Sequence, residues 1–207
     1  MKKIALSLIF ISTFSIFTLA NDDTQKVSLW KPHKSGAYIG LGYGYLKQSI
    51  KDIDYPDARS FSLVVDSIMF QGGYKYNSYF SLEGRYWLGV TKIRQSGGSS
   101  SGTYSGNMDA YGIYLKPNIP FDNGLKLYAL FGYADTSVRY DNGSKWDTDG
   151  YSCGIGLEYL MTKDMGIFID YIKLNTARSF DYNDQNDIDA KVSISTFNFG
   201  LNYKFQF

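Results

Sequence analysis

The chain has 207 residues, which favours one domain, and its 21 Lys plus Arg residues nearly balance its 20 Asp plus Glu residues. A near-neutral chain has no excess of positive charge to attract a polyanion, so no nucleic-acid partner is expected. The counts of 19 Tyr, 14 Phe and 21 Gly against four Pro favour an all-β chain over a helical one.

The first element is the apolar segment "MKKIALSLIFISTFSIFTLA" at residues 1–20. Lys2 and Lys3 precede the apolar run and small residues stand before Asn21, which resembles a cleaved secretory signal peptide. A retained anchor helix is the rival interpretation, but serines and threonines interrupt the run. We therefore expect residues 1–20 to be removed on export and residues 21–33 to form a periplasmic lead-in. Beyond them, no stretch reaches the roughly 18 consecutive apolar residues of a membrane-spanning helix.

From residue 35 onward, apolar residues alternate with polar residues or glycines. In the first run, 35–46, odd positions such as Leu41 and Tyr43 are apolar, whereas glycine occupies most even positions. A period of two is the pattern of a β-strand with two unlike faces. Similar runs follow at residues 67–76, 80–90, 111–116, 125–133, 151–159, 166–174 and 198–207. The sequence therefore predicts eight strands.

Three of these runs are less regular than the others. The fourth is expected to stop where Pro117 and Pro120 stand, because proline cannot donate a ladder hydrogen bond. In the fifth, Tyr128 and Leu130 obscure the polarity of one face. In the seventh, the register past Tyr171 stays open.

The connections between the runs alternate in length. Short turns are expected at residues 77–78, 119–124 and 162–164, and long polar segments at residues 49–63, 94–106, 136–148 and 175–190. Asn142 and Gly143 predict a two-residue hairpin turn, so that the flanking strands continue beyond the bilayer. Short turns at one end and long loops at the other are typical of an eight-stranded antiparallel up-and-down transmembrane β-barrel.

Alternation alone does not decide which face points outward, because a soluble barrel or sandwich also alternates. Two features favour an apolar exterior. Large aromatic residues such as Tyr43, Tyr74 and Tyr133 stand near strand ends, where a bilayer has its interfacial girdles. The opposite faces combine small residues with a few charges of both signs. We predict that these charges lie in the lumen: Lys75, Glu83, Arg85, Lys116, Glu158, Asp170 and Lys204.

Eight strands enclose an interior that side chains fill, so free passage of solutes is not expected. Glu83 and Arg85 stand two residues apart on one strand and share its inner face. We expect the lumen charges to form a structural network of ion pairs. An ion path, or a gate opened by exchange of pairs, is the alternative, because ionisable residues inside membranes are often functional.

The end of the chain alternates strictly. A membrane barrel closes only when its last strand pairs with its first, because an open edge leaves backbone groups unsatisfied in hydrocarbon. A terminal Phe207, preceded at two-residue steps by Phe205, Tyr203 and Leu201, resembles the C-terminal assembly signal of bacterial outer-membrane proteins. The resemblance implies recognition by the barrel-assembly machinery, after periplasmic chaperones have carried the chain.

The leader, the eight runs, the final Phe and segments such as "SLEGRY" and "YALFGYADT" together carry a family resemblance. Over residues 34–207, the predicted barrel domain, the chain resembles the small outer-membrane β-barrel superfamily of Gram-negative bacteria. That group includes opacity-type adhesins, the transmembrane domain of outer-membrane protein A and "porin family" proteins. The resemblance implies residence in the outer membrane beside lipid and lipopolysaccharide, and it is nearly silent about activity.

Three functions are weighed. The first is a non-enzymatic barrel whose long loops serve envelope structure or bind an unknown surface ligand. The second, which is the alternative to it, is a narrow porin for ions or small solutes. The third is a lipid-modifying enzyme, which needs a histidine base, yet the single histidine, His33, is expected on the periplasmic side. We therefore predict no catalytic residue and no cofactor. The four aspartates between residues 181 and 189 lack the glycine and glutamate of a calcium loop, so no metal site is predicted.

Overall fold

The computed structural model describes residues 35–52, 61–97, 102–121, 123–141, 143, 145–175, 178–181 and 189–205. Its strands, in chain order, are β1 Gly36–Asp52, β2 Phe61–Lys75, β3 Phe80–Gly89, β4 Ile93–Ser96, β5 Gly102–Tyr104, β6 Gly106–Pro120, β7 Leu125–Tyr140, β8 Lys145–Leu160, β9 Met165–Lys173, β10 Arg178–Asp181 and β11 Asp189–Lys204. Among these residues no helix is long and apolar enough to cross a membrane. The predicted signal peptide, the predicted lead-in and Phe207 lie outside the described residues.

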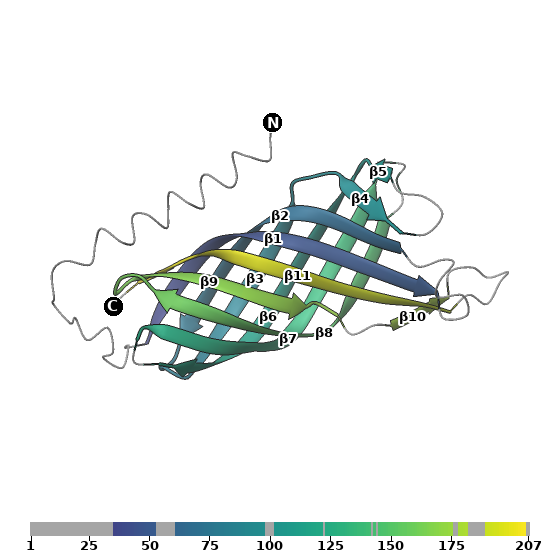
Figure 1. Cartoon of the computed structure of the whole chain (residues 1–207). Coiled ribbons are helices and arrows are strands. Elements are labelled where there is room, and N and C mark those ends of the chain that lie inside the picture. The colour runs from purple at the N-terminus through teal and green to yellow at the C-terminus, as the bar shows by residue number, and fades with distance from the viewer. Residues whose placement is uncertain are drawn as a thin grey trace, which may run out of the picture.

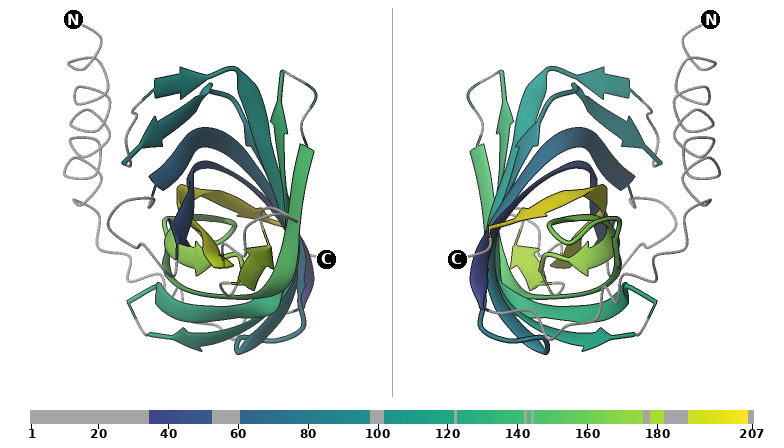
Figure 2. Two further views of the ribbon diagram at one scale, coloured as in Figure 1. Left: turned by 90° about the vertical axis from the view of Figure 1, so that its right-hand side faces the viewer. Right: turned by 90° about the vertical axis from the view of Figure 1, so that its left-hand side faces the viewer.

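Eight of the described strands form a closed antiparallel barrel. Around the ring, β1 pairs with β2, and the order continues through β3, β6, β7, β8, β9 and β11. The ring closes because β11 pairs with β1, from Tyr38↔Lys204 to Asp52↔Ala190. The end-on views in Figure 2 show this closed wall of strands. The predicted eight-stranded barrel is confirmed, and its last strand does pair with its first.

The two ends of the barrel differ, as the connection lengths predicted. At the end that we call the short-turn end, tight turns join β2 to β3, β6 to β7 and β8 to β9, and the chain also leaves the barrel there after β11 (Figure 1). At the opposite, long-loop end, β4 pairs with β2 and β5, and β10 pairs with β11. In barrels of this type the short turns face the periplasm and the long loops face the cell exterior.

Several strands are longer than the sequence pattern predicted. β6 passes Pro117 and ends at Pro120, the second of the two prolines at which the stop was expected. The register to β7 is the same on both sides of Pro117, with Leu115↔Phe131 before it and Asn118↔Tyr128 after it. The strand passes through because a proline removes only its own ladder donor and an extended backbone already suits its fixed φ.

The hairpin between β7 and β8 extends far beyond the predicted runs. The two strands stay paired up to Arg139↔Lys145, which fits the expectation that they continue past the bilayer. The N–H of Gly143 donates to the carbonyl of Tyr140 (3.0 Å), and Gly143 has φ +88°, a left-handed conformation that favours glycine. Gly143 is therefore the last residue of the turn. The sequence had predicted it as one of the two central residues, and this prediction is wrong. Asn142 lies outside the described residues.

Within the half of the barrel that includes the short-turn end, apolar side chains point outward and polar ones inward. On β1, for example, Ile39 and Leu41 are 55% and 56% exposed, whereas Tyr38, which directly precedes Ile39, is buried. Aromatic residues border this band at both ends, with Tyr74 and Tyr203 towards the short turns and Tyr133 towards the long loops. The pattern is that of a lipid-facing belt with two aromatic girdles.

Beyond the outer girdle the pattern inverts. Leu46 and Ile50 of β1 are buried inside the barrel, whereas Lys47 between them is exposed. On the other strands the inward apolar side chains of this region include Leu63, Val65, Ile93, Met108, Val138, Val192 and Ile194, all of which belong to one buried cluster. This part of the molecule is therefore built like a soluble β-barrel, with an apolar core and a polar exterior. The sequence analysis did not predict this change.

Candidate functional site

The interior of the barrel contains the predicted lumen residues, in three layers along its axis. The middle layer is centred on Glu83 of β3, a residue with no exposed surface. Its carboxylate accepts hydrogen bonds from Arg85 Nε at 2.7 Å and Lys116 Nζ at 2.9 Å. The phenol of Tyr38, on β1, donates a third bond to it at 2.6 Å. Two cations and a phenol thus compensate one buried carboxylate, as a buried charge requires.

Arg85 also reaches across the lumen. Its Nη1 lies 2.8 Å from Asp170 Oδ2 on β9. Because β3 and β9 stand four strands apart in either direction around the ring of eight, this ion pair joins opposite walls. Asp170 also accepts bonds from the Tyr128 phenol (2.7 Å) and from Asn198 Nδ2 (2.7 Å). The bridge is therefore anchored at both ends by further hydrogen bonds.

Large side chains fill the space around this bridge. Trp87, Tyr114 and Tyr128 are each at most 1% exposed. The Trp87 indole N–H donates to Asn198 Oδ1 at 2.8 Å, so its polar atom is satisfied. Small residues make the room for these rings: a Cβ on Gly73 would lie 2.6 Å from the phenol oxygen of Tyr38. These buried side chains occupy the lumen at this level.

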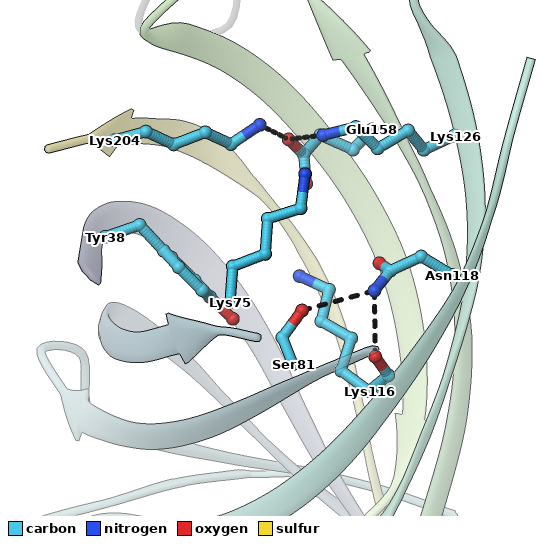
Figure 3. A pocket seen from close by; sticks show the side chains of 8 residues that line it. All are labelled: Tyr38, Lys75, Ser81, Lys116, Asn118, Lys126, Glu158 and Lys204. Atoms are coloured by element: carbon cyan, nitrogen blue, oxygen red, sulfur yellow. Dashed lines mark hydrogen bonds and ion pairs between the residues drawn. The ribbon is translucent and has the colours of Figure 1, made fainter. Parts of the chain in front are cut away.

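The layer nearest the short-turn end is a lysine cluster: Lys75, Lys116, Lys126 and Lys204 line one small cavity, together with Tyr38, Ser81, Asn118 and Glu158 (Figure 3). Lys126 Nζ and Lys204 Nζ lie 3.0 Å and 2.9 Å from the same atom, Glu158 Oε1. Figure 3 shows Lys75 extending towards that carboxylate from below, between Lys204 and Lys126. Three lysines thus gather around Glu158.

Lys126 is an interior charge that the sequence analysis missed. It stands on β7 between Leu125 and Leu127, in the run whose inner face looked apolar because of Tyr128 and Leu130. The sequence feature that could have identified it is its position opposite the outward odd residues of the run. In the structure, Lys126 pairs with Glu158, a predicted lumen residue. The predicted charges were four positive and three negative, and Lys126 raises the positive number to five among the described interior side chains.

The third layer, towards the long-loop end, is the apolar cluster already described. Leu130, Ile172 and Leu174 are at most 1% exposed and join it to the middle layer. The register of β9 past Tyr171, which the sequence left open, therefore points Ile172 inward. The polar network is thus covered by an apolar plug on its outer side.

The outer rim carries an open recess of about 380 Å³, formed where β3 and β7 end and β6 begins. Its lining includes Lys92, Asn107, Arg139 and Asp141. On the neighbouring hairpin, Lys145 Nζ lies 2.7 Å from Asp147 Oδ2, with both side chains about half exposed. The hydrogen bond from Lys145 lowers the pKa of the Asp147 carboxyl below its ordinary value. The rim is therefore polar and accessible.

Three residues of the predicted C-terminal signal point to the outside of the barrel, and the fourth, Phe207, lies outside the described residues. Leu201, Tyr203 and Phe205 are between 38% and 46% exposed and belong to β11 or follow it directly. Recognition of this strand by assembly factors is a prediction that the geometry leaves untested. No group of three or more His, Cys, Asp or Glu side chains in the described residues is arranged to hold a metal ion. Of the four aspartates between residues 181 and 189, the two central ones lie outside those residues.

The closed ring and its exposed apolar belt define an integral membrane β-barrel. The chain matches the model of the outer membrane protein β-barrel domain over residues 6–205, and it belongs to this family. Membership of this family locates the protein in the outer membrane. No curated protein matches the sequence.

Solved structures agree with the fold. The outer membrane protein OprG from Pseudomonas aeruginosa is similar with a TM-score of 0.53 at 14% identity, over 84% of this chain and 98% of that one. The N-terminal β-barrel domain of OprF, from the same organism, has a TM-score of 0.50 at 12% identity, over 84% of this chain and all of that domain. At these identities the likeness concerns the fold alone.

Proposed function

We propose that the protein is a non-enzymatic barrel that spans the outer membrane, contributes to the structure of the envelope and presents its long-loop end for surface interactions. The observation that carries this proposal is the Arg85–Asp170 ion pair, which joins opposite walls of the barrel at 2.8 Å. An ion pair that joins opposite walls makes the barrel rigid, and it occupies the space that a pore would need. Rigid walls are what a scaffold for external loops needs.

The long-loop end supports the interaction role. The strands continue beyond the outer girdle and enclose an apolar core, which holds β4, β5 and the β7–β8 hairpin away from the membrane surface. The recess of about 380 Å³ lies at this end. Its mixed lining of Lys92, Arg139 and Asp141 is suited to a polar ligand or to lipopolysaccharide headgroups, and it does not single out one of them.

A narrow pore for ions or small solutes is the alternative. The ion pairs Lys126–Glu158 and Arg85–Asp170 favour it, because exchange between ion partners would open a polar path through the half of the barrel near the short-turn end. The apolar plug at Leu130 and Ile172 opposes it, because an ion would have to cross this layer without partners. The balance therefore favours the closed scaffold.

For biogenesis we propose export through a cleaved signal peptide at residues 1–20, escort by periplasmic chaperones and recognition by the barrel-assembly machinery. The exposed apolar stripe of β11, with Leu201, Tyr203 and Phe205, supports that recognition because its side chains point outward, where a binding partner can contact them.

The test combines two measurements on the detergent-extracted protein. Folded barrel migrates faster on a gel before heating than after it, which reports the fold, and the same preparation is reconstituted into planar bilayers for single-channel recording. We expect heat-modifiable migration without discrete openings. Discrete openings in a preparation that is fully folded on the gel would favour the pore. The variant Leu130→Gly, which weakens the plug, is the matched positive control for recording.

A further inference from the structure

The lysine cluster carries more positive charge than the described carboxylates neutralise. Four ammonium groups line the cavity, and the carboxylates that contact them are Glu158 and, through Lys116, Glu83. Two positive charges are therefore in excess. Such an excess is costly inside a barrel wall, where an unpaired charge loses its hydration without gaining a partner.

Lys75 is the member that lacks a partner. The residue is 7% exposed, and among the described residues its ammonium makes neither a hydrogen bond nor an ion pair. It extends from β2 towards Glu158 (Figure 3), but the lysine contacts on that carboxylate belong to Lys126 and Lys204. An ammonium with three donors and no acceptor among the described residues therefore borders the cavity.

The size and lining of the cavity restrict what can satisfy Lys75. Its volume is about 10 Å³, which is roughly enough for one water-sized occupant. Ser81 Oγ accepts a hydrogen bond from Asn118 Nδ2 at 3.2 Å, so its hydroxyl proton is available to an occupant. Ammonium and hydroxyl donors beside a net positive charge select an anion over a cation, and the volume selects a monoatomic one over phosphate or a carboxylic acid.

We propose that this cavity is a binding site for one small inorganic anion, chloride in ordinary media, held by Lys75 and Ser81 in the field of Lys126 and Lys204. The anion completes the charge balance of the short-turn end. This site is independent of the envelope role proposed above. Because the anion binds the folded barrel and not the unfolded chain, it stabilises the fold by mass action.

The first experiment measures thermal stability by the loss of fast gel migration. The detergent-extracted protein is titrated with sodium chloride, while sodium gluconate keeps the ionic strength constant so that general screening does not change. Gluconate is too large for the cavity. We expect chloride to raise the unfolding midpoint with saturation. Equal midpoints in chloride and gluconate would overturn the proposal, and so would a larger shift with inorganic phosphate than with chloride.

Two variants separate an anion site from a merely structural lysine. Lys75→Met removes the unpaired ammonium, so the variant should be at least as stable as the wild type in gluconate and should need more than about tenfold more chloride for the same shift. Glu158→Gln removes the competing carboxylate, so chloride should act at lower concentration. Lys145→Met, at the exposed outer hairpin, is the matched control and should respond as the wild type does. A wild-type chloride response in Lys75→Met would refute the site.

The second experiment locates the ion directly. Crystals of the protein grown in chloride and exchanged into bromide should show one anomalous peak in contact with Lys75 Nζ. Peaks confined to the outer surface, with a water in the cavity, would overturn the assignment even if chloride stabilised the protein.

Discussion

The same strands form two regions of opposite polarity. In the lower region, near the short-turn end, apolar side chains point outward, and in the upper region, near the long-loop end, they point inward. Between the girdles, Leu41 faces outward and Glu83 inward; past the outer girdle, Lys47 faces outward and Leu46 inward. The backbone pairing of β1 with β11 continues without a break through the change. What changes is the solvent: lipid requires an apolar exterior and leaves the lumen to polar groups, whereas water requires the reverse.

Hydrogen bonds between the outward side chains mark where the change occurs. The Tyr111 phenol donates to Asp135 Oδ2 at 3.2 Å, and the Tyr133 phenol donates to Asp149. A phenol with an apolar ring and a polar tip suits the boundary between acyl chains and headgroups. The carboxylates beyond it therefore lie at or outside the headgroup level.

The largest expected effect concerns the polar lower region. Arg85→Met leaves Asp170 with only the neutral donors Tyr128 and Asn198, so a buried charge loses its cation. We expect a loss of about 3–5 kcal/mol in the free energy of unfolding, measured by urea denaturation in lipid vesicles with Trp87 among the fluorescent probes.

A control for that loss is the double variant Arg85→Met with Asp170→Asn. It removes both charges, so it should be less destabilised than the sum of the two single variants. Strict additivity would show that the two side chains do not interact across the lumen.

The next effect concerns the apolar upper region. Leu46→Ala should cost about 2–5 kcal/mol, because it leaves a cavity in a packed core. Leu41→Ala, five residues earlier on the same strand, should cost clearly less, because lipid chains refill the space. The same denaturation measurement decides this. Equal costs at the two positions would mean that the upper interior is not a core.

The sequence predicted the barrel and its inner face because, where lipid surrounds a strand, the apolar face of the alternation points outward. The prediction failed beyond the membrane, where water surrounds the strands and the apolar face points inward. Both faces of β7 carry large apolar side chains, since Leu127 contacts lipid while Leu130 packs in the interior, and a hydropathy pattern cannot separate these two environments. Lys126 was lost for this reason. The extended ends of β7 and β8 looked like polar loop because their outward residues face water.

The interior contacts themselves lay beyond the reach of the pattern. Glu83 and Arg85 were expected to interact because they share a face on one strand, and they do lie 2.7 Å apart. The partners across the lumen depend on the stagger of the strands around the ring. This stagger decides that Arg85 forms an ion pair with Asp170, whereas Lys75 forms none with the described carboxylates. A single sequence contains no direct measure of that stagger.

The smallest expected effect compares a lysine of the outer rim with those of the interior. Lys145→Met removes the hydrogen bond that lowers the pKa of Asp147. The carboxyl should then titrate at a higher pH, nearer its ordinary value, and a pH titration of the aspartate carboxyl carbon resonances measures this. The wild-type pair favours the folded state only above the unfolded pKa of Asp147, and this contribution fades as the pH falls through its lowered native pKa. Because both side chains are about half exposed, water screens the pair, and the unfolding midpoint at neutral pH should not change measurably. An unchanged titration of Asp147 would contradict the pairing, whereas a large loss of stability would mean that the outer hairpin is as tightly coupled to its charges as the lumen is.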